Sequence, residues 1–368
     1  MIQGHGDDAW RFGRPIRANF SSNVFGHVDL ARLKGHLATR LDAIGRYPEP
    51  EPYSLERALA GRLGIAPDSV CVTNGATEAI YLTAHAFAGS RSAILGPTFS
   101  EYADACAIYN HIVICAGQAR DGLVERQGSF GALRPHRPQK GSCAPQGCLS
   151  DAGHDLIWLC NPNNPTGSVV PKAKLAAEIE GHPDTVYVID QSYGFFTREP
   201  LFSTAEAAAY PNVILLHSMT KRYAMPGLRL GYVTGDPNLV DRLRSVRMPW
   251  SVNALAIEAG LYLCEHPDTA PIDLPSLLAE TQRLRAALDA LPGLTAEPTQ
   301  THFFLCRLAK GSAADLKLWL ADMHGLLIRD ASNFEGLDAG CFRIATQTPE
   351  ENDMLIEAIS RYLEEVTA

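Results

Sequence analysis

The sequence contains no long apolar run and no excess of positive charge. A membrane-spanning helix needs about 18 or more consecutive apolar residues, and the 368 residues contain no such run. Near the N-terminus, Asp7 and Asp8 stand where a secretory signal would have its apolar core. Lysine and arginine total 32 against 41 acidic residues, and the net charge of −9 argues against the basic face of a nucleic-acid binder. We therefore expect a globular cytoplasmic protein whose partners include neither a membrane nor a nucleic acid.

Disulfide and metal signatures are also missing. The nine cysteines are odd in number and form no C-x-x-C pair, so we expect reduced, mostly buried thiols. His136, Cys143 and Cys148 occur in a polar segment rich in glycine and proline, residues 118–153. Their irregular spacing favours a surface loop over a metal site, and we expect no metal. The segment is too long for an ordinary connection, so it is either a surface excursion or a functional loop.

Short apolar runs alternate with helical patterns along the chain, which predicts an α/β fold with a mostly parallel sheet. The expected strands are 92–96, 156–160, 186–190, 213–217 and 228–233, followed in a later block by 302–307, 326–328 and 341–345. The expected helices are 77–88, 171–180 and 239–246. The length predicts two domains. We assign residues 45–245 to a large domain, and residues 1–44 and 246–368 to a smaller α+β domain.

A lysine stands in an unusual position in this pattern. Lys221 follows the expected strand 213–217, and in open α/β sheets ligands bind beyond the carboxyl ends of the strands. The hydroxyl groups of Ser218 and Thr220, together with Arg229, suit a phosphate dianion. A lysine beside such a site can form a Schiff base with an aldehyde. Taken alone, the pattern also fits a surface lysine after a strand.

Three other motifs occupy comparable positions. Residues 161–167 follow the expected strand 156–160, where an asparagine amide can reach a ligand oxygen. Asp190 ends another strand and can keep a ring nitrogen protonated, as a pyridine cofactor requires. Residues 74–78 open a helix whose free amides favour phosphate. Each motif alone also fits a turn, a strand end or a helix cap, and their joint order is what is specific.

Together the motifs resemble those of the fold-type I pyridoxal-phosphate enzymes, the class I/II aminotransferase superfamily. The resemblance covers nearly the whole chain and rests on NGATE (74–78), PTFSEY (97–102), NPNNPTG (161–167), VIDQSY (188–193), SMTKRYAMPGLRLGY (218–232) and CFRIA (341–345). It implies an α/β enzyme with pyridoxal 5'-phosphate as cofactor. It also implies a homodimer with active sites at the subunit interface.

The resemblance assigns roles to matching residues. Lys221 becomes the lysine that binds the cofactor covalently and moves a proton, Asp190 the partner of the ring nitrogen, and Tyr193 a donor to the phenolic oxygen. Tyr47 is expected to reach the cofactor phosphate of the neighbouring subunit. The other implied cofactor contacts are Gly75, Ala76, Thr77, Tyr102, with Phe99 packed beside it, Asn164, Ser218, Thr220 and Arg229.

Residues 3–23 and 328–337 narrow the resemblance to threonine-phosphate decarboxylases and, more distantly, to histidinol-phosphate aminotransferases. Arg343 is then expected to pair with the substrate α-carboxylate, with Asn164 beside it. The residues expected around the substrate phosphate are Arg329, His5 and Asn23. For Arg329 the alternative is a surface arginine, and for His5 a flexible terminus. The chain departs from the decarboxylase pattern H-G-G, since it has His5, Gly6 and Asp7 there.

The expected reaction is the decarboxylation of a phosphorylated amino acid, with L-threonine O-3-phosphate to aminopropanol phosphate, a step of cobalamin biosynthesis, as the best match. One alternative is an aminotransferase of the histidinol-phosphate type, which acts on a phosphorylated amine and uses glutamate and 2-oxoglutarate. Another is a non-enzymatic regulator that binds pyridoxal phosphate. Such regulators carry a DNA-binding module, and the sequence has no basic helix-turn-helix segment.

Overall fold

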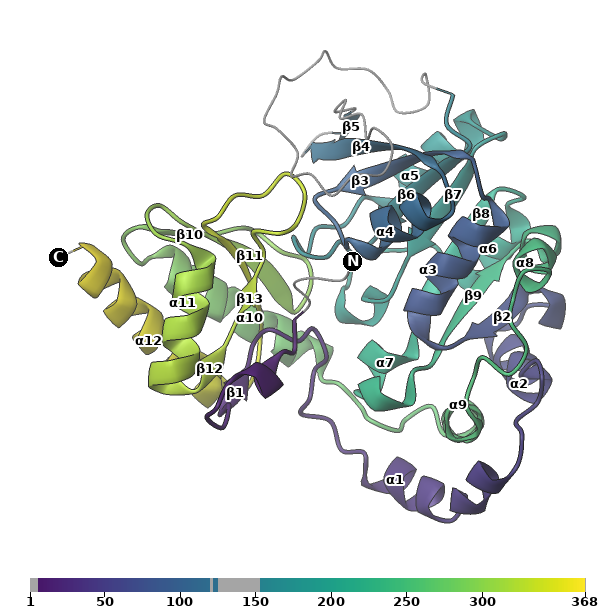
Figure 1. Cartoon of the computed structure of the whole chain (residues 1–368), viewed down its shortest axis with the longest axis horizontal. Coiled ribbons are helices and arrows are strands. Elements are labelled where there is room, and N and C mark those ends of the chain that lie inside the picture. The colour runs from purple at the N-terminus through teal and green to yellow at the C-terminus, as the bar shows by residue number, and fades with distance from the viewer. Residues whose placement is uncertain (1–5, 120–121, 125–152, 368) are drawn as a thin grey trace.

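The structure is a computed structural model that describes residues 6–119, 122–124 and 153–367. Its main element is an eight-stranded sheet (Figure 1). In spatial order its strands are β2 (Val70–Thr73), β9 (Gly231–Gly235), β8 (Val213–Ser218), β7 (Val186–Asp190), β6 (Leu156–Cys160), β3 (Arg91–Gly96), β4 (Ile112–Ala119) and β5 (Gly122–Val124). The pairs from β8 to β4 are parallel, while β9 runs antiparallel to both of its neighbours and β5 antiparallel to β4.

Alternating side chains of this sheet belong to cores on its two faces. In β8, Ile214 and Leu216 pack in one core, whereas Val213 and Leu215 pack in the other. This follows from the two-residue period of a strand, and it explains why these runs are apolar throughout. The helices of the first core are α3 (Gly75–Ala86), α4 (Glu101–Ile108) and α8 (Pro237–Arg244), and those of the second are α5 (Lys172–Gly181) and α6 (Thr204–Ala209).

A smaller sheet lies beside the large one (Figure 1). It is antiparallel, in the order β10 (Leu294–Ala296), β11 (Phe303–Leu308), β14 (Cys341–Ala345) and β13 (Arg329–Asp330). The helices in this part of the chain are α10 (Leu274–Asp289), α11 (Ala313–Trp319) and α12 (Pro349–Thr367). The α/β fold class with a mostly parallel sheet, predicted from the sequence, is confirmed.

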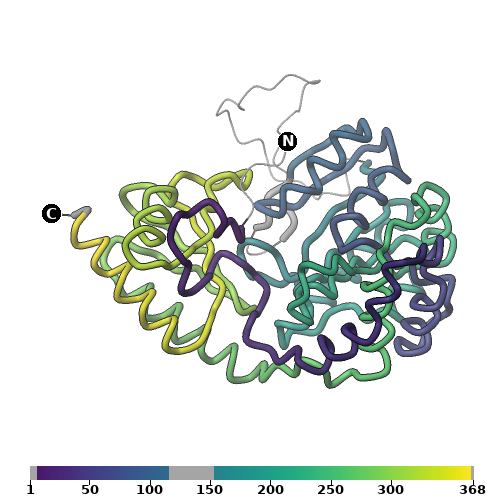
Figure 2. The backbone as a smooth tube through the Cα atoms, turned by 60° about the horizontal axis from the view of Figure 1, so that its bottom comes forward, coloured from purple at the N-terminus to yellow at the C-terminus, as the bar shows by residue number. Residues whose placement is uncertain are grey.

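The N-terminal segment joins the small sheet region before it crosses to the large sheet (Figure 2). β1 (Ala18–Asn19) pairs in parallel with β12 (Leu326–Leu327), and Phe20 is fully buried in the same core as β11 and β14. The helices α1 (Ala31–Ala38), α2 (Tyr53–Leu63) and α9 (Ala254–Glu265) then pack in a third core with β2. The domain boundaries at residues 44/45 and 245/246 stay a prediction.

One strand begins later than the sequence predicts. We expected a strand at 228–233, whereas β9 begins at Gly231, because a 3-10 turn covers Pro226–Leu228 and Arg229 has a positive φ of 57°. Among the described residues no helix is long and apolar enough to cross a membrane. Within the same ranges no group of three or more metal-ligating side chains occurs. His136, Cys143, Cys148 and most of segment 118–153 lie outside the described residues.

Candidate active site

The parallel strands of the large sheet end at one edge, and these ends carry the sequence motifs. β2, β6, β7 and β8 run in the same direction and end at Thr73, Cys160, Asp190 and Ser218. A cavity of about 220 Å³ lies at this edge, and its wall is completed by the N-terminal segment, β13 and β14. The predicted site residues that line it are Asn23, Ala76, Thr77, Phe99, Tyr102, Asn164, Asp190, Tyr193, Ser218, Thr220, Lys221, Arg229, Arg329 and Arg343.

Lys221 lies in α7 (Met219–Arg222), directly after β8, and lines this cavity. Removal of the amine from water lowers its pKa from 10.5 to about 8, and the positive charges of Arg343 and Arg229 act in the same direction. The carboxylates of Asp7 and Asp190 act in the opposite direction. A much larger fraction of this amine than of an ordinary lysine is therefore uncharged, and so nucleophilic, near neutral pH.

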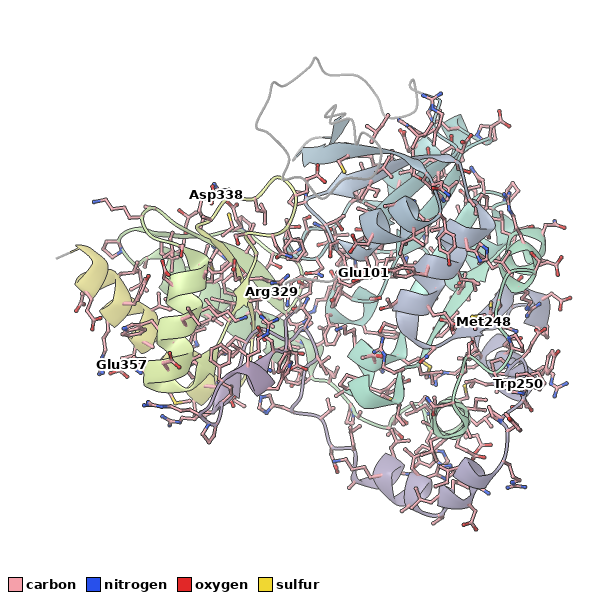
Figure 3. All side chains as sticks on the ribbon, viewed as in Figure 1. Glu101, Met248, Trp250, Arg329, Asp338 and Glu357 are labelled. Atoms are coloured by element: carbon pink, nitrogen blue, oxygen red, sulfur yellow. The ribbon has the colours of Figure 1, made fainter. Side chains whose placement is uncertain are left out.

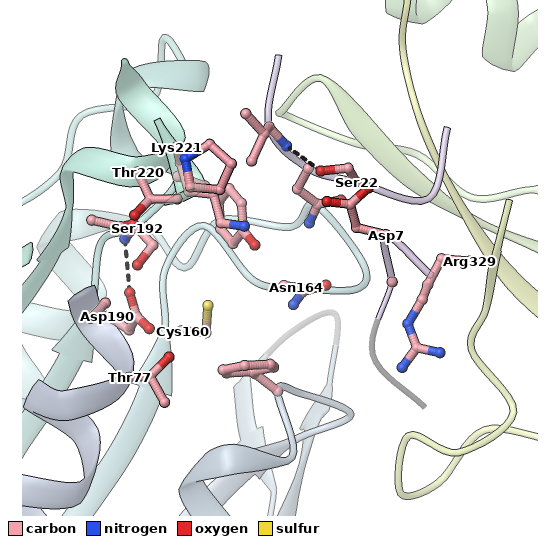
Figure 4. A pocket seen from close by; sticks show the side chains of 18 of the residues that line it. Asp7, Ser22, Thr77, Cys160, Asn164, Asp190, Ser192, Thr220, Lys221 and Arg329 are labelled. Atoms are coloured by element: carbon pink, nitrogen blue, oxygen red, sulfur yellow. Dashed lines mark hydrogen bonds between the residues drawn. The ribbon is translucent and has the colours of Figure 1, made fainter. Parts of the chain in front are cut away.

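Asp190 presents a fixed carboxylate to the cavity. The Tyr102 hydroxyl donates a hydrogen bond of 2.7 Å to Oδ2. The Ser192 amide donates one of 2.8 Å to Oδ1 (Figure 4). Burial raises the pKa of Asp190, while these two donors and Lys221 lower it. A buried carboxylate with two ordered donors is suited to hold a cationic ring nitrogen.

An anion cradle forms where α3 begins. Gly75 has a φ of 77°, and a Cβ on it would lie 2.8 Å from Nη2 of Arg229. Gly231 faces the same turn, since a Cβ there would lie 2.6 Å from the amide nitrogen of Ala76. The two glycines thus let the arginine and the helix N-terminus approach each other. The buried Oγ1 of Thr220, which also lines the cavity, has no hydrogen-bond partner among the described residues. These donors suit a phosphate.

Two buried arginines face the cavity from the small sheet. Arg329 in β13 and Arg343 in β14 stand directly opposite each other, and each is 5% exposed. Arg343 donates from Nη1 to Oδ1 of Asn164 at 2.5 Å and from Nη2 to the Ser21 carbonyl at 2.6 Å. Arg329 donates to the Asp330 carbonyl and to Oδ1 of Asn333.

Neither guanidinium forms an ion pair with a carboxylate of the described residues. Desolvation lowers the pKa of Arg343 to about 9 and that of Arg329 to about 10, and the charge of Arg329 lowers the pKa of Arg343 further. Like charges placed opposite on neighbouring strands destabilise a sheet. An anionic ligand would therefore stabilise the charged forms of both arginines and offset the repulsion between them.

Two of the predicted residues that the structure describes do not line the cavity. Gly75 lies beside it, against Arg229. Tyr47 is 87% exposed and contacts Trp250, with ring centroids 5.6 Å apart. His5 lies outside the described residues.

Sequence reasoning missed several lining residues. They are Gly6, Asp7, Ser21, Ser22, Val24, Ile80, Ser100, Cys160, Ser192, Pro226 and Phe334. Ser21 and Ser22 belong to the stretch 3–23 that narrowed the resemblance, and Cys160 directly precedes the motif at 161–167. Their positions in the sequence were thus available signals, but serine and cysteine do not by themselves indicate a site.

A family model described as aminotransferase class I and II matches residues 19–359. The chain belongs to this family. The threonine-phosphate decarboxylase of Salmonella typhimurium is 31% identical over 351 residues, which cover 94% of this chain and 91% of that protein. The crystal structure of the L-threonine-O-3-phosphate decarboxylase from Porphyromonas gingivalis has a TM-score of 0.83 and 37% identity, and the match covers 94% of this chain and 99% of that one. A histidinol-phosphate aminotransferase of Desulfitobacterium hafniense is 29% identical over 329 residues, 87% of this chain and 85% of that protein.

Membership of the class I and II aminotransferases confirms three expectations. The chain is an enzyme, its fold is that of the fold-type I enzymes, and its cofactor is pyridoxal 5'-phosphate. The roles of individual residues stay predictions.

Proposed function

We propose that this protein decarboxylates a phosphorylated amino acid, and that the substrate is L-threonine O-3-phosphate, converted to aminopropanol phosphate in cobalamin biosynthesis. The arginine pair of the small sheet carries this proposal. Arg229 is the arginine beside the cofactor-phosphate cradle, so Arg329 and Arg343 remain for the substrate. A phosphorylated amino acid brings two anionic groups, and two neighbouring guanidiniums without carboxylate partners complement them. The names of the relatives at 31% and 37% identity support the same substrate.

The cavity fits pyridoxal phosphate. Its phosphate would be held by the first amides of α3, by Arg229 and by Thr220, whose buried hydroxyl lacks a partner within the described ranges. Asp190 would hold the ring nitrogen, and Tyr102 would lie against the ring. When bound, the cofactor supplies an electron-accepting ring that stabilises negative charge at the substrate α-carbon.

The side chains of the chain itself orient the substrate and move protons. Arg343 binds the α-carboxylate, and Asn164 fixes the guanidinium through Oδ1. Arg329 binds the phosphate and so determines the rotation of the substrate about its α-carbon. Held at both ends by Arg329 and Arg343, the substrate would present its carboxylate bond, rather than its C–H bond, for cleavage. With its pKa lowered to about 8, the amine of Lys221 can take up a proton and, as the ammonium form, deliver it to the α-carbon.

Product identification by mass spectrometry tests the function. The enzyme with pyridoxal phosphate is incubated with O-phosphothreonine, with and without 2-oxoglutarate, and in parallel with histidinol phosphate and 2-oxoglutarate. Release of carbon dioxide and formation of aminopropanol phosphate without the oxo acid is the expected result. Formation of glutamate only in the presence of 2-oxoglutarate would instead identify an aminotransferase of the histidinol-phosphate type, the activity named for several relatives.

The enzyme is further proposed to be a cytoplasmic homodimer in which Tyr47 reaches the partner's cofactor phosphate. The exposed Tyr47 contacts Trp250, and Met248 and Trp250 lie on one side of the larger part (Figure 3). These residues and Ile44 are 50% to 87% exposed, and exposed apolar side chains that lie together are typical of a protein–protein interface. The described cysteines are all free thiols, which agrees with the cytoplasm.

A complementation experiment tests the shared site. A Tyr47→Ala variant and a Lys221→Ala variant, each of low activity alone, are unfolded together and refolded as a mixture. If Tyr47 acts across the interface, mixed dimers hold one site with both residues intact, and activity reappears up to about a quarter of the wild-type value. If Tyr47 acts within its own chain, each site of the mixed dimer carries a defect and no activity returns.

A further inference from the structure

Asp7 occupies a backbone conformation that few residues other than glycine adopt. Its φ is 64°, and its side chain lines the cavity. The Asn19 amide donates to Oδ1 of Asp7 at 2.6 Å, and the backbone amide of Asp7 donates to Oγ of Ser21 at 2.8 Å. A positive φ at a residue with a side chain costs on the order of 1 kcal/mol, and such strain persists where the surroundings hold it, often at functional sites.

The residues on either side of Asp7 fix the segment against the small sheet. A Cβ on Gly6 would lie 2.4 Å from the Ser21 carbonyl and 3.3 Å from Cδ of Arg329, so the chain passes close to both. The Asp8 carboxylate points elsewhere and pairs with Lys317, with contacts of 2.7 and 2.8 Å. Asp7 is thus held in place, and of these two neighbouring carboxylates only that of Asp7 faces the cavity.

The two acidic side chains that line the cavity differ in their surroundings. Asp7 and Asp190 are the acidic side chains among the described residues that line it. Asp190 is engaged by Tyr102 and Ser192 deep in the site, whereas Asp7 is exposed to solvent at the opening. In Figure 4, Asp7 and Arg329 lie on the side of the cavity opposite Asp190 and Thr220. The carboxylate of Asp7 nevertheless acts electrostatically on Lys221, the position where an incoming amine must react.

We propose that Asp7 is a specificity-determining residue that binds the ammonium group of the incoming substrate. This inference rests on the proposed function. An amino acid phosphate has three charged groups, and the cavity offers one complement for each: Arg343 for the carboxylate, Arg329 for the phosphate and Asp7 for the ammonium. A ligand that carries the two anions but no ammonium meets the same arginines and, at Asp7, a like charge. The carboxylate therefore favours amino acids over their deaminated counterparts.

The test compares two ligands on the holoenzyme. O-phosphothreonine carries the ammonium, and 3-phosphooxybutanoate is the same molecule without it. The variant Asp7→Asn keeps the oxygen that Asn19 binds and tolerates the positive φ, so it removes charge while keeping shape. We expect the KM for O-phosphothreonine to rise about fivefold to tenfold. The inhibition constant of 3-phosphooxybutanoate should stay unchanged or fall.

Asp8→Asn is the matched control, because it removes a neighbouring carboxylate that pairs with Lys317 and does not line the cavity. It should leave unchanged the ratio of the KM for O-phosphothreonine to the inhibition constant of 3-phosphooxybutanoate. If Asp7→Asn weakens both ligands alike, or changes neither, Asp7 does not bind the ammonium group, and the proposed function still stands. If the wild-type enzyme neither turns over nor binds O-phosphothreonine, the proposed function fails and this inference fails with it.

Discussion

Replacement of Arg329 by methionine is expected to make the cofactor-free protein more stable and the enzyme less active. The pKa of Arg329 is lowered from 12.5 to about 10, chiefly by desolvation. A lowered folded-state pKa means that the fold disfavours the charged form at every pH below about 10. The shift means that the charge on the buried guanidinium lowers the free energy of unfolding by roughly 3 kcal/mol. The lost hydrogen bonds to Asp330 and Asn333, worth about 1 kcal/mol each, offset part of it.

The net expectation for Arg329→Met is a free energy of unfolding that is about 1 kcal/mol higher than that of the wild type at neutral pH. Activity should move the other way, because a buried guanidinium is lost from the phosphate. We expect kcat/KM for O-phosphothreonine to fall by a factor of about 100 to 1000, corresponding to roughly 3 to 4 kcal/mol. For unphosphorylated threonine the change should stay within about threefold.

Urea unfolding of the cofactor-free protein, followed by tryptophan fluorescence, measures the stability. Carbon dioxide release measures the activity on both substrates. Arg307→Met serves as the control, since Arg307 lies in β11 of the same sheet, is about half exposed and pairs with Asp338 at the surface. That variant should change neither quantity appreciably. A less stable Arg329→Met protein, or an equal loss with phosphorylated and unphosphorylated substrate, would refute the reasoning.

Four further outcomes are expected. Lys221→Ala should abolish covalent attachment of pyridoxal phosphate, seen as the loss of the mass increase after borohydride reduction, and a retained increase would assign the lysine elsewhere. The rate at which the cofactor-free chain captures pyridoxal phosphate should rise with pH through about 8, because the uncharged amine of Lys221 reacts. Arg343→Met should move this midpoint upward, since Arg343 lowers that pKa. Gly75→Ala should weaken cofactor binding about tenfold or more by displacing Arg229, whereas Gly89→Ala, which also has a positive φ but open space around it, should not.

The parts of the site that depend on the order of residues along a single strand and its end could be predicted from the sequence. β6 and β7 have the predicted bounds, and Asp190 and Lys221 follow their strands as expected, because buried parallel strands are apolar throughout and end where polar ligands begin. The opposition of Arg329 and Arg343 could not be predicted, since it depends on the register of two antiparallel strands.

Other features depend on tertiary contacts or on a second chain. Asp7 has a positive φ, with its backbone amide bound to Ser21 and its carboxylate bound to Asn19, and no local pattern indicates such a conformation for aspartate. The late start of β9 has a similar origin in the positive φ of Arg229. Tyr47 has no place in the cavity of its own chain, so its predicted role requires the partner subunit.

The hydrogen bond between Ser21 and Arg343, which joins the N-terminal segment to β14, has a consequence for synthesis on the ribosome. The Ser21 carbonyl, which accepts a hydrogen bond from Arg343, is made 322 residues before its partner. At roughly 5 to 20 residues per second, the N-terminal wall of the site waits between about 15 and 65 s for the strands that complete it. A nascent chain can therefore form the large sheet early, yet it acquires a working pocket only when translation is nearly finished.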